Sequence, residues 1–164
     1  MNPSLSMTDR AFEQFSATLD RSGLRAALAD LLEMTDFRFI AIFRFRGDKA
    51  NAAVFYDREQ PDVTAAVEVP AKATYCYFAR DPGGAFTTGD ALQDARLSSH
   101  PAREAVQSYC GVPVMTAEGE LLGSLCHYDV VPRDPAGIDF ELILRIASML
   151  AYRGLVPPYP ASAT

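Results

Sequence analysis

Apolar side chains recur at helical spacing through residues 8–35, in two groups that Ser22 and Gly23 separate. Side chains three and four positions apart share one face of a helix, so each group predicts a helix with one buried face. Thr8 or Asp9 is expected to cap the first helix. Because glycine disfavours a helix interior, the pattern predicts two consecutive helices or one kinked helix. The apolar positions are Phe12, Phe15, Leu19, Leu24, Ala27, Leu28, Leu31 and Leu32.

The apolar period changes to two in residues 37–45, where every second side chain is apolar. A period of two predicts a strand, and residues 47–48 supply a turn into a partner strand over residues 50–57. A polar connection follows, with a short edge strand expected near Val67. The pattern thus predicts a β-hairpin in the first half of the chain.

Residues 58–107 show no sustained period. Within them, residues 73–81 suit either a strand or a short helix, and residues 85–90 predict a short strand. The segment SSHPAREAVQ, residues 98–107, predicts the start of a helix, with a serine as its cap and the proline in its first turn.

A second hairpin and a last helix complete the pattern. In residues 109–129, two extended runs flank a turn that contains glycine, which predicts a hairpin. A final helix with one apolar face is expected from near Asp134 to about Arg153. Glycine at position 154 ends it, and residues 154–164 are expected to form a mobile tail.

This order of elements predicts a single α+β domain over residues 1–164, with its core in roughly residues 20–152. The hairpin connections imply a central antiparallel sheet. Helices from the two termini are expected to cover one face of the sheet, and the irregular segment 58–107 to fold over the other. A pocket between the sheet and that segment is the expected ligand site.

Composition narrows the classes of partner. Hydrophobic residues make up 49% of the chain and charged residues 22%, as is typical of a globular domain. No apolar run approaches the roughly 20 residues that cross a bilayer, and the N-terminus lacks the pattern of a secretory signal. The net charge of −6 and the absence of a basic stripe disfavour nucleic acid and anionic membranes as partners. We therefore expect a cytoplasmic protein that binds neither.

The chain has three cysteines, Cys76, Cys110 and Cys126, and two histidines, His100 and His127. An odd number of cysteines without regular spacing argues against a disulfide framework. The absence of a CxxC motif and the distance between the histidines argue against a zinc site. We expect no metal site and assign no catalytic residue. His127 is interpreted as a packed strand residue, and His100 as a capping or surface residue.

The hairpin YCGVPVMTAEGELLGSLCHYD, residues 109–129, resembles the central hairpin of GAF domains. The segment GDALQDARLSSHP, residues 89–101, is similar to a second segment of that family, although Ala95 stands where many members have proline. The resemblance covers roughly residues 20–152. It implies a central antiparallel sheet, terminal helices on one face and a small-molecule pocket on the other. It also implies a sensory or regulatory role, since relatives bind metabolites, nucleotides, bilins or haem.

The register of the second hairpin decides which side chains share a face, because a slip of one residue reverses the face. With a three-residue loop over residues 117–119, Cys110 lies opposite Cys126. With a four-residue loop over residues 116–119, the two cysteines point to opposite faces. The resemblance favours the second register. It then groups on the pocket face Tyr109, Ser124, Cys126 and Tyr128.

Aromatic residues gather in the segments expected around the pocket. Phenols offer apolar area and a hydrogen-bonding tip, which suits a small aromatic or zwitterionic metabolite; a plain core is the alternative interpretation. Asp94 and Arg96 either clasp a loop or close a lid over the pocket. Cys126 is interpreted as pocket wall rather than as a reactant. The predicted ligand-binding residues are Tyr75, Phe78, Phe86, Asp94, Arg96, Tyr109, Ser124, Cys126 and Tyr128.

The predicted function is a sensory module that binds a small molecule, whose identity and cofactor the sequence does not give. A homodimer through the terminal helices and a signalling protein partner are expected. One alternative is an enzyme of the resembled family, the free methionine-(R)-sulfoxide reductase. Its catalytic cysteine would fall near Ala102, and Cys110 lies too close to Pro113 to match it. A ligand-free protein-interaction module is the other alternative.

Overall fold

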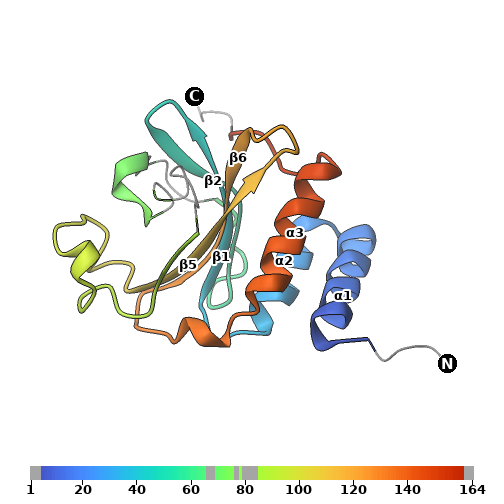
Figure 1. The fold of residues 1–164 in the computed structure, drawn as a ribbon, viewed down its shortest axis with the longest axis horizontal. Helices are drawn as coiled ribbons and strands as arrows, with labels where there is room; N and C mark the ends of the chain where they lie inside the picture. The colour runs from blue at the N-terminus through green and yellow to red at the C-terminus, as the bar shows by residue number, and fades with distance from the viewer. Residues whose placement is uncertain (1–4, 66–68, 76–77, 79–84, 161–164) are drawn as a thin grey trace.

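Three helices cover one face of a six-stranded antiparallel sheet (Figure 1). The computed structural model describes residues 5–65, 69–75, 78 and 85–160. The helices are α1 (Met7–Ser22), α2 (Leu24–Glu33) and α3 (Phe140–Tyr152). The strands are β1 (Phe39–Arg46), β2 (Lys49–Asp57), β3 (Val69–Pro70), β4 (Phe86–Thr88), β5 (Ser108–Met115) and β6 (Leu121–Asp129). Short 3-10 turns are η1 (Ala71–Ala73), η3 (Ala95–Leu97) and η4 (Pro135–Gly137).

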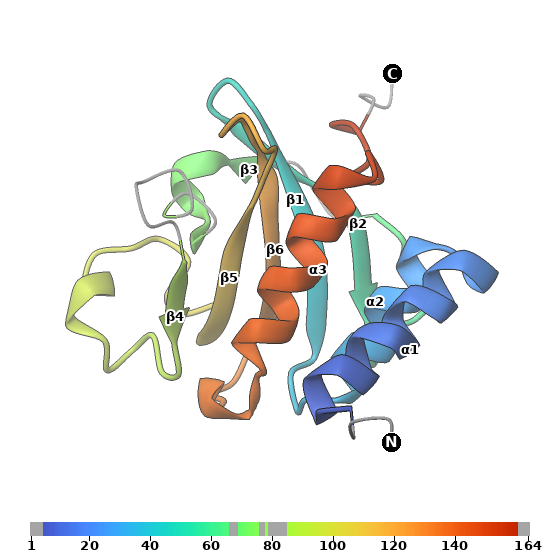
Figure 2. The ribbon, with the colours of Figure 1, turned by 45° about the vertical axis from the view of Figure 1, so that its right-hand side comes forward.

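The strand order across the sheet is β3-β2-β1-β6-β5-β4, and each neighbouring pair is antiparallel. Figure 2 shows α1, α2 and α3 on one side of the sheet, with the segments around β4 at the far side. The predicted α+β fold, with helices from both termini on one face, is confirmed.

The first helical segment divides at Gly23 into two consecutive helices. Gly23 adopts a φ of 94°, a conformation that glycine reaches without strain, and its N–H donates to the Leu19 carbonyl at 3.0 Å. Ser6, rather than Thr8 or Asp9, is the cap of α1. The Asp9 N–H donates to Ser6 Oγ at 3.0 Å, and the Ser6 N–H donates back to Asp9 Oδ2 at 3.3 Å. This reciprocal pair is a capping box.

The final helix begins later than expected, because two aspartates each start a separate element. Asp134 caps η4 by accepting from the Ala136 N–H at 2.9 Å. Asp139 then caps α3 by accepting from the Leu142 N–H at 3.1 Å. Each carboxylate satisfies a backbone donor that a helix start leaves without a partner, so the chain turns between them.

The first hairpin has the predicted strands and turn. β1 pairs with β2 from Arg46 and Lys49 at the turn to Phe39 and Asp57 at the far end. The short strand predicted within residues 85–90 is β4, which pairs with β5. β3 adds a short edge strand to β2, whereas Val67 lies outside the described residues.

The helix predicted in residues 98–107 is wrong, because these residues form consecutive turns. The Val106 N–H donates to the Ala102 carbonyl at 2.8 Å, but no regular helix follows. The Arg103 guanidinium donates to the carbonyls of Ser98 and Leu92, at 3.2 and 3.0 Å. These side-chain bonds to the backbone hold the segment in a turn.

The second hairpin has a three-residue loop. The Thr116 N–H donates to the Glu120 carbonyl at 2.9 Å, and the Glu120 N–H donates to Thr116 Oγ1 at 3.0 Å. These two bonds close a loop over residues 117–119, where Gly119 has a φ of 87°. The four-residue loop that the family resemblance favours is therefore wrong.

A β-bulge follows this loop and shifts the pairing by one residue. Met115 pairs with Leu121, whereas Val114 pairs with Gly123, so Leu122 is the extra residue. The loop has one residue fewer than expected, and the bulge adds one residue to β6. Together the two changes leave each side chain on the face that the four-residue loop predicts. The predicted distribution of side chains over the two faces is thus retained, although the predicted loop is not.

The two cysteines of this hairpin consequently lie on opposite faces of the sheet. Cys110 pairs with His127 and belongs to the cluster beneath the helices. Cys126 pairs with Gly111 and belongs to the cluster on the other face. The alternative register, with Cys110 opposite Cys126, does not occur.

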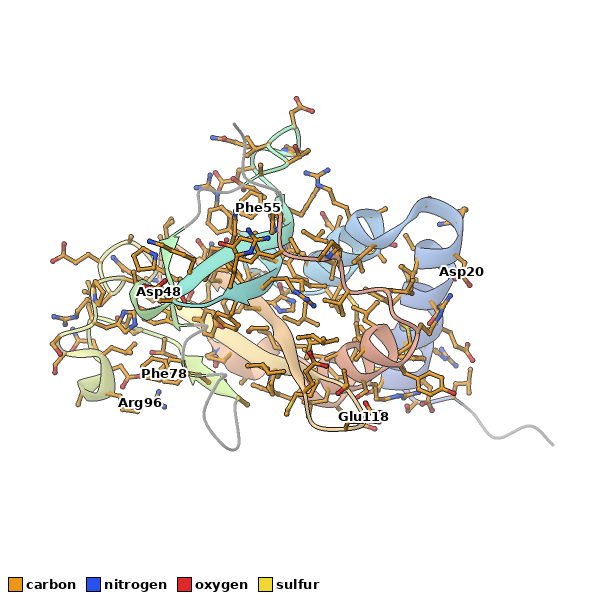
Figure 3. The ribbon with its side chains drawn as sticks, turned by 90° about the horizontal axis from the view of Figure 1, so that it is seen from above. Asp20, Asp48, Phe55, Phe78, Arg96 and Glu118 are labelled. Atoms are coloured by element: carbon orange, nitrogen blue, oxygen red, sulfur yellow. The ribbon has the colours of Figure 1, made fainter. Side chains whose placement is uncertain are left out.

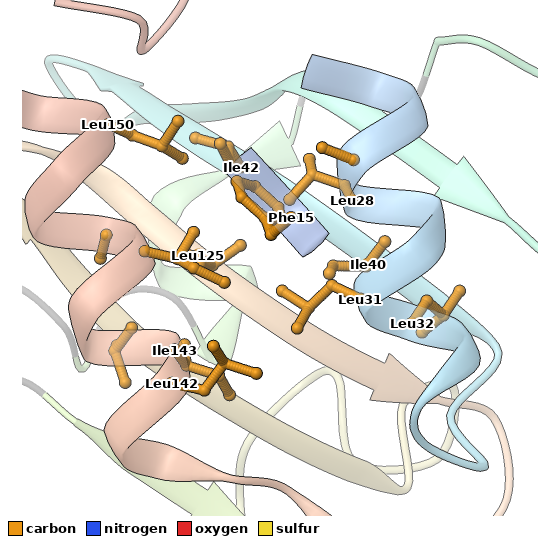
Figure 4. Packing of buried hydrophobic residues seen from close by; sticks show 14 of the residues in the cluster. Phe15, Leu28, Leu31, Leu32, Ile40, Ile42, Leu125, Leu142, Ile143 and Leu150 are labelled. Carbon is orange, nitrogen blue, oxygen red and sulfur yellow. The ribbon is translucent and has the colours of Figure 1, made fainter. Parts of the chain in front are cut away.

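Each face of the sheet has its own hydrophobic cluster. On the helical side, Leu28 of α2 and Ile143 of α3 point toward Leu125 of β6 (Figure 4). Leu155 and Val156, in the described part of the predicted tail, pack against the same cluster. The buried residues of the other cluster are Ala41, Phe43, Ala50, Ala52, Phe55, Ala71, Tyr75, Phe86, Ala91, Leu97, Tyr109 and Cys126.

Gly123→Ala tests the close approach of β6 to β1. A Cβ at position 123 would overlap the Phe43 carbonyl oxygen, so paired backbone would have to shift. We expect the free energy of unfolding, measured in urea, to fall by about 3 kcal/mol, as for severe overpacking. Gly137→Ala is the matched control, because a Cβ there meets no heavy atom within 4 Å. Equal losses in the two variants would contradict the close approach.

Candidate functional site

Five rings gather on the sheet face opposite the helices, around β4 and β5. These residues, which we call the aromatic cluster, are Tyr75, Phe78, Phe86, His100 and Tyr109. The rings of Phe78 and Phe86 stack with their centroids 4.5 Å apart. Tyr75 lies edge-on to Tyr109 at 5.4 Å and 4.7 Å from His100. Four of the five residues are among those predicted to bind a ligand.

The phenols of Tyr75 and Tyr109 are buried with polar partners. The Tyr75 hydroxyl donates to the Val106 carbonyl at 2.7 Å, and burial raises the pKa of Tyr75 to about 12. Tyr109 Oη lies 3.4 Å from Ser124 Oγ. The Tyr109 ring has room because Gly111 carries no side chain, and a Cβ there would overlap the phenol. Residues two apart in a strand share a face, so this glycine decides where the phenol lies.

A second group of rings lies on the same face over β1 and β6. Tyr128 stacks on Phe39 with ring centroids 4.8 Å apart and lies 6.4 Å from Phe43. Beside them, Cys126 Sγ donates to the Ala41 carbonyl at 3.6 Å, and the residue is fully buried. The Cys126 sulfur is therefore a packed part of the hydrophobic cluster on this face of the sheet.

Asp94 and Arg96 tie η3 to β4. Arg96 Nη2 donates to Asp94 Oδ2 at 2.6 Å and to the Thr87 carbonyl at 2.7 Å. The guanidinium lies 4.6 Å from the centre of the Phe86 ring, as in a cation–π contact. The hydrogen bond from Arg96 holds the pKa of Asp94 well below its usual range. Figure 3 shows Arg96 and Phe78 at the same end of the molecule. Asp94 and Arg96 together hold the loop against β4, as in the predicted clasp.

The predicted ligand-binding residues thus lie in two adjoining groups on one face of the sheet. Asp94 and Arg96 border the aromatic cluster, and Ser124 joins it to the group around Tyr128. Only 2% of Tyr75 and 3% of Tyr109 is exposed, so these side chains themselves fill the space against the sheet. A ligand that binds here must displace part of the aromatic cluster.

His100 is the member of the aromatic cluster that sequence reasoning missed. Its Nδ1 accepts from the Ala102 N–H at 3.1 Å, in a turn rather than at the predicted helix start. Its ring also lies 5.8 Å from Phe78, and burial lowers the pKa of His100. The segments that meet here are separated in the sequence and follow no regular period, so no local pattern signals their contact.

Neither described thiol is placed for nucleophilic chemistry. Cys110 is 1% exposed, and burial raises its pKa to about 11, which leaves very little thiolate at neutral pH. Cys126 lies on the other face and is fully buried, so the two sulfurs cannot form a disulfide with each other. Cys76 lies outside the described residues.

The described residues contain neither a metal-binding cluster nor a helix that could span a membrane. Among those residues, no three or more His, Cys, Asp or Glu side chains come together in a way that could hold a metal ion. Within the same residues, no helix combines the length and apolar character needed to cross a membrane.

A family model for the GAF domain matches residues 22–153. Among curated proteins, a cyclic di-GMP phosphodiesterase from Pseudomonas aeruginosa is 37% identical over 90 residues, which cover 52% of this chain. The same match covers 15% of that enzyme, so the chain spans a small part of this relative.

Solved structures share the fold over almost the whole chain. The GAF domain of an Acinetobacter phosphoenolpyruvate-protein phosphotransferase has a TM-score of 0.69 at 13% identity, covering 93% of this chain and 94% of that one. A free methionine-R-sulfoxide reductase from Neisseria meningitidis, in complex with its substrate, has a TM-score of 0.67 at 17% identity, covering 94% of each chain. At these identities the likeness shows the fold alone.

Gly111→Ala tests the close contact between the Gly111 backbone and the Tyr109 phenol. The new methyl group would displace the ring, and we expect the free energy of unfolding to fall by about 2 kcal/mol. In a Tyr109→Ala background the same change should cost clearly less, because the overlapping ring is gone. A double-mutant cycle in urea should therefore give a coupling of about 1 kcal/mol or more. Additive losses would show that the two residues do not meet.

Proposed function

Because the chain belongs to the GAF domain family, we propose that it is a sensory or regulatory domain that binds a small molecule at the aromatic cluster. The observation that carries this proposal is the gathering of stacked rings, phenol hydroxyls and a guanidinium on one face of the sheet. The Neisseria reductase, which shares the fold, was solved with its substrate, which supports a small-molecule role for this scaffold.

The ligand favoured by these groups is largely flat and apolar, with a carboxylate or zwitterionic end. Phe78 and Phe86 offer stacking area. Arg96 is 58% exposed at its side chain, and within the described residues its Nη1 makes no hydrogen bond, so it can donate to a carboxylate.

A ligand-free interaction module is the second candidate function. The specific observation in its favour is that Tyr75 and Tyr109 are almost completely buried, so the aromatic cluster already fills its face. In that case the rings serve only as a core, and any regulatory role depends on protein contacts. Binding measurements on small molecules separate the two candidates.

Thiol-dependent sulfoxide reduction is disfavoured as the function of this chain. That chemistry needs a thiolate that can reach the substrate and a second thiol to resolve the intermediate. Cys110 lies beneath the helices with a raised pKa, and Cys126 is fully buried on the opposite face. Among the described residues, the fold shared with the Neisseria reductase is therefore not accompanied by thiols placed for this chemistry.

We further propose that the chain forms a homodimer through α1 and α3 and acts in the cytoplasm on a signalling protein. Leu144 of α3 is 47% exposed, and Met7 at the start of α1 is 87% exposed. A groove of about 390 Å³ lies between Phe12 of α1 and Leu144. Exposed apolar surface of this kind is typical of interaction sites.

The ligand proposal predicts compounds that raise the melting temperature of the protein in a panel of aromatic acids, amino acids and nucleotides. Phe78→Ala and Arg96→Met should weaken the affinity for such a compound by about tenfold each, because stacking area and a charged donor are lost. Arg10→Met, on the exposed face of α1, is the control and should leave the affinity unchanged. If no compound binds by thermal shift or native mass spectrometry, the interaction module is favoured instead.

The dimer proposal predicts that Leu144→Glu yields a monomer, because it places a charge in the apolar contact between α3 helices. Light scattering of the wild type and the variant measures the mass directly. Met115→Glu, at a 43% exposed position beside the hairpin turn, is the control and should remain dimeric. A monomeric wild type at high concentration would exclude the dimer.

A further inference from the structure

Two cavities adjoin on the helical side of the sheet, on the face opposite the aromatic cluster. The outer cavity has a volume of about 240 Å³ and the inner cavity about 40 Å³. Met34 and Thr35, which follow α2, and Gly137 of η4 line both cavities. These shared walls place the inner cavity between the outer one and β6, which supplies His127.

His127 lines the inner cavity with an imidazole that lacks a polar partner. The residue is 0% exposed, and neither Nδ1 nor Nε2 makes a hydrogen bond within the part of the chain that the structure describes. Its ring meets Phe37 edge-on, with centroids 6.1 Å apart. Buried polar groups nearly always have hydrogen-bond partners. We therefore expect a polar group in this cavity to form a hydrogen bond with the imidazole.

The inner cavity has room for one such group. Its volume of about 40 Å³ exceeds the roughly 15 Å³ that a cavity needs in order to hold one water molecule. The walls around His127 are mainly apolar, and Figure 4 shows Leu31 of α2 and Leu142 of α3 directed into the space between their helices. A small, mainly apolar cavity that contains an imidazole without a partner favours a small group that hydrogen-bonds once or twice.

The neutral imidazole of His127 suits a neutral hydrogen-bonding group. Burial, together with the positive charge of Arg58, lowers the pKa of His127 to about 4, so the imidazole is neutral at neutral pH. The Asp139 carboxylate also lines the cavity, but it accepts from the Leu142 N–H and the Thr8 hydroxyl. A neutral imidazole donates from one nitrogen and accepts at the other. A hydroxyl group can satisfy either nitrogen.

The outer cavity has an excess of negative charge. Asp36 and Asp134 line it, and neither forms a salt bridge among the described residues. Arg133 lines the cavity as well, but its Nε is paired with Asp129 Oδ2 at 2.9 Å. A carboxylate or phosphate would be repelled here, whereas a cation would be attracted.

We propose that the two cavities form one binding site for a small amine that carries a hydroxyl group. The hydroxyl lies in the inner cavity against His127, and the ammonium group lies in the outer cavity near Asp36 and Asp134. The volumes suit a molecule of a few heavy atoms and exclude a nucleotide. This site is separate from the aromatic cluster, so its test does not depend on the proposed sensory ligand.

Titration with 3-aminopropan-1-ol tests the site, with propylamine and propan-1-ol as analogues that lack the hydroxyl or the charge. We expect the amino alcohol to bind about tenfold more tightly than either analogue. His127→Phe keeps a buried ring without nitrogens and should remove the advantage over propylamine. The double variant Asp36→Asn and Asp134→Asn should remove the advantage over propan-1-ol. Glu118→Gln, an exposed change of charge at the β5–β6 loop, should alter none of the three affinities.

The ¹⁵N resonances of the histidine side chains give a readout on the wild-type protein, should a variant fail to fold. Addition of 3-aminopropan-1-ol should shift the His127 resonances and leave those of His100 in place, while propylamine should shift neither. Equal affinities for the three compounds, or His127 resonances that do not respond, would overturn the proposal. A crystal structure with only water in the inner cavity at saturating amino alcohol would overturn it as well.

Discussion

The close approach of the antiparallel neighbours β6 and β1 at Gly123 is the contact on which the rest of the structure depends. The absence of a side chain at Gly123 lets the β6 backbone approach the Phe43 carbonyl. The neighbouring bulge at Leu122 then fixes the register of β6 against β5. Because side chains alternate along a strand, this register alone decides which face receives each functional group of the second hairpin.

The consequence is a division of chemistry between the two faces. His127 and Cys110 lie beneath the helices, among aliphatic side chains that lower the pKa of the imidazole and raise that of the thiol. Tyr109 and Tyr128 lie on the other face among aromatic rings. The proposed sensory ligand and the proposed amine thus lie on opposite faces of the sheet, and a shift of β6 would move both His127 and Ser124, which contacts Tyr109.

The sequence could predict the elements whose periodicity is regular. The alternation in residues 37–45 and the helical spacing before residue 35 were sufficient for β1, α1 and α2, because the apolar side chains of these elements recur with a regular period. The helix prediction for residues 98–107 failed because Arg103 donates hydrogen bonds to the backbone carbonyls of Ser98 and Leu92, which no local pattern reveals.

The site was predictable in composition but not in geometry. The aromatic residues around position 75 and in β5 were correctly grouped, since the family resemblance places their segments around one face. The bulge could not be predicted, because Leu121 and Leu122 are equally apolar and either could occupy the extra position. His100 joins the aromatic cluster through contacts with Tyr75 and Phe78 that depend on the folded chain.

Nuclear Overhauser contacts of the β6 side chains test the division between the two faces most directly. With the register described here, the His127 ring should show contacts to Phe37 and to methyl groups of α3, and the Tyr128 ring should show contacts to Phe39. Contacts between the His127 ring and Tyr109 would place the histidine on the aromatic face. That result would contradict the register and both binding sites derived from it.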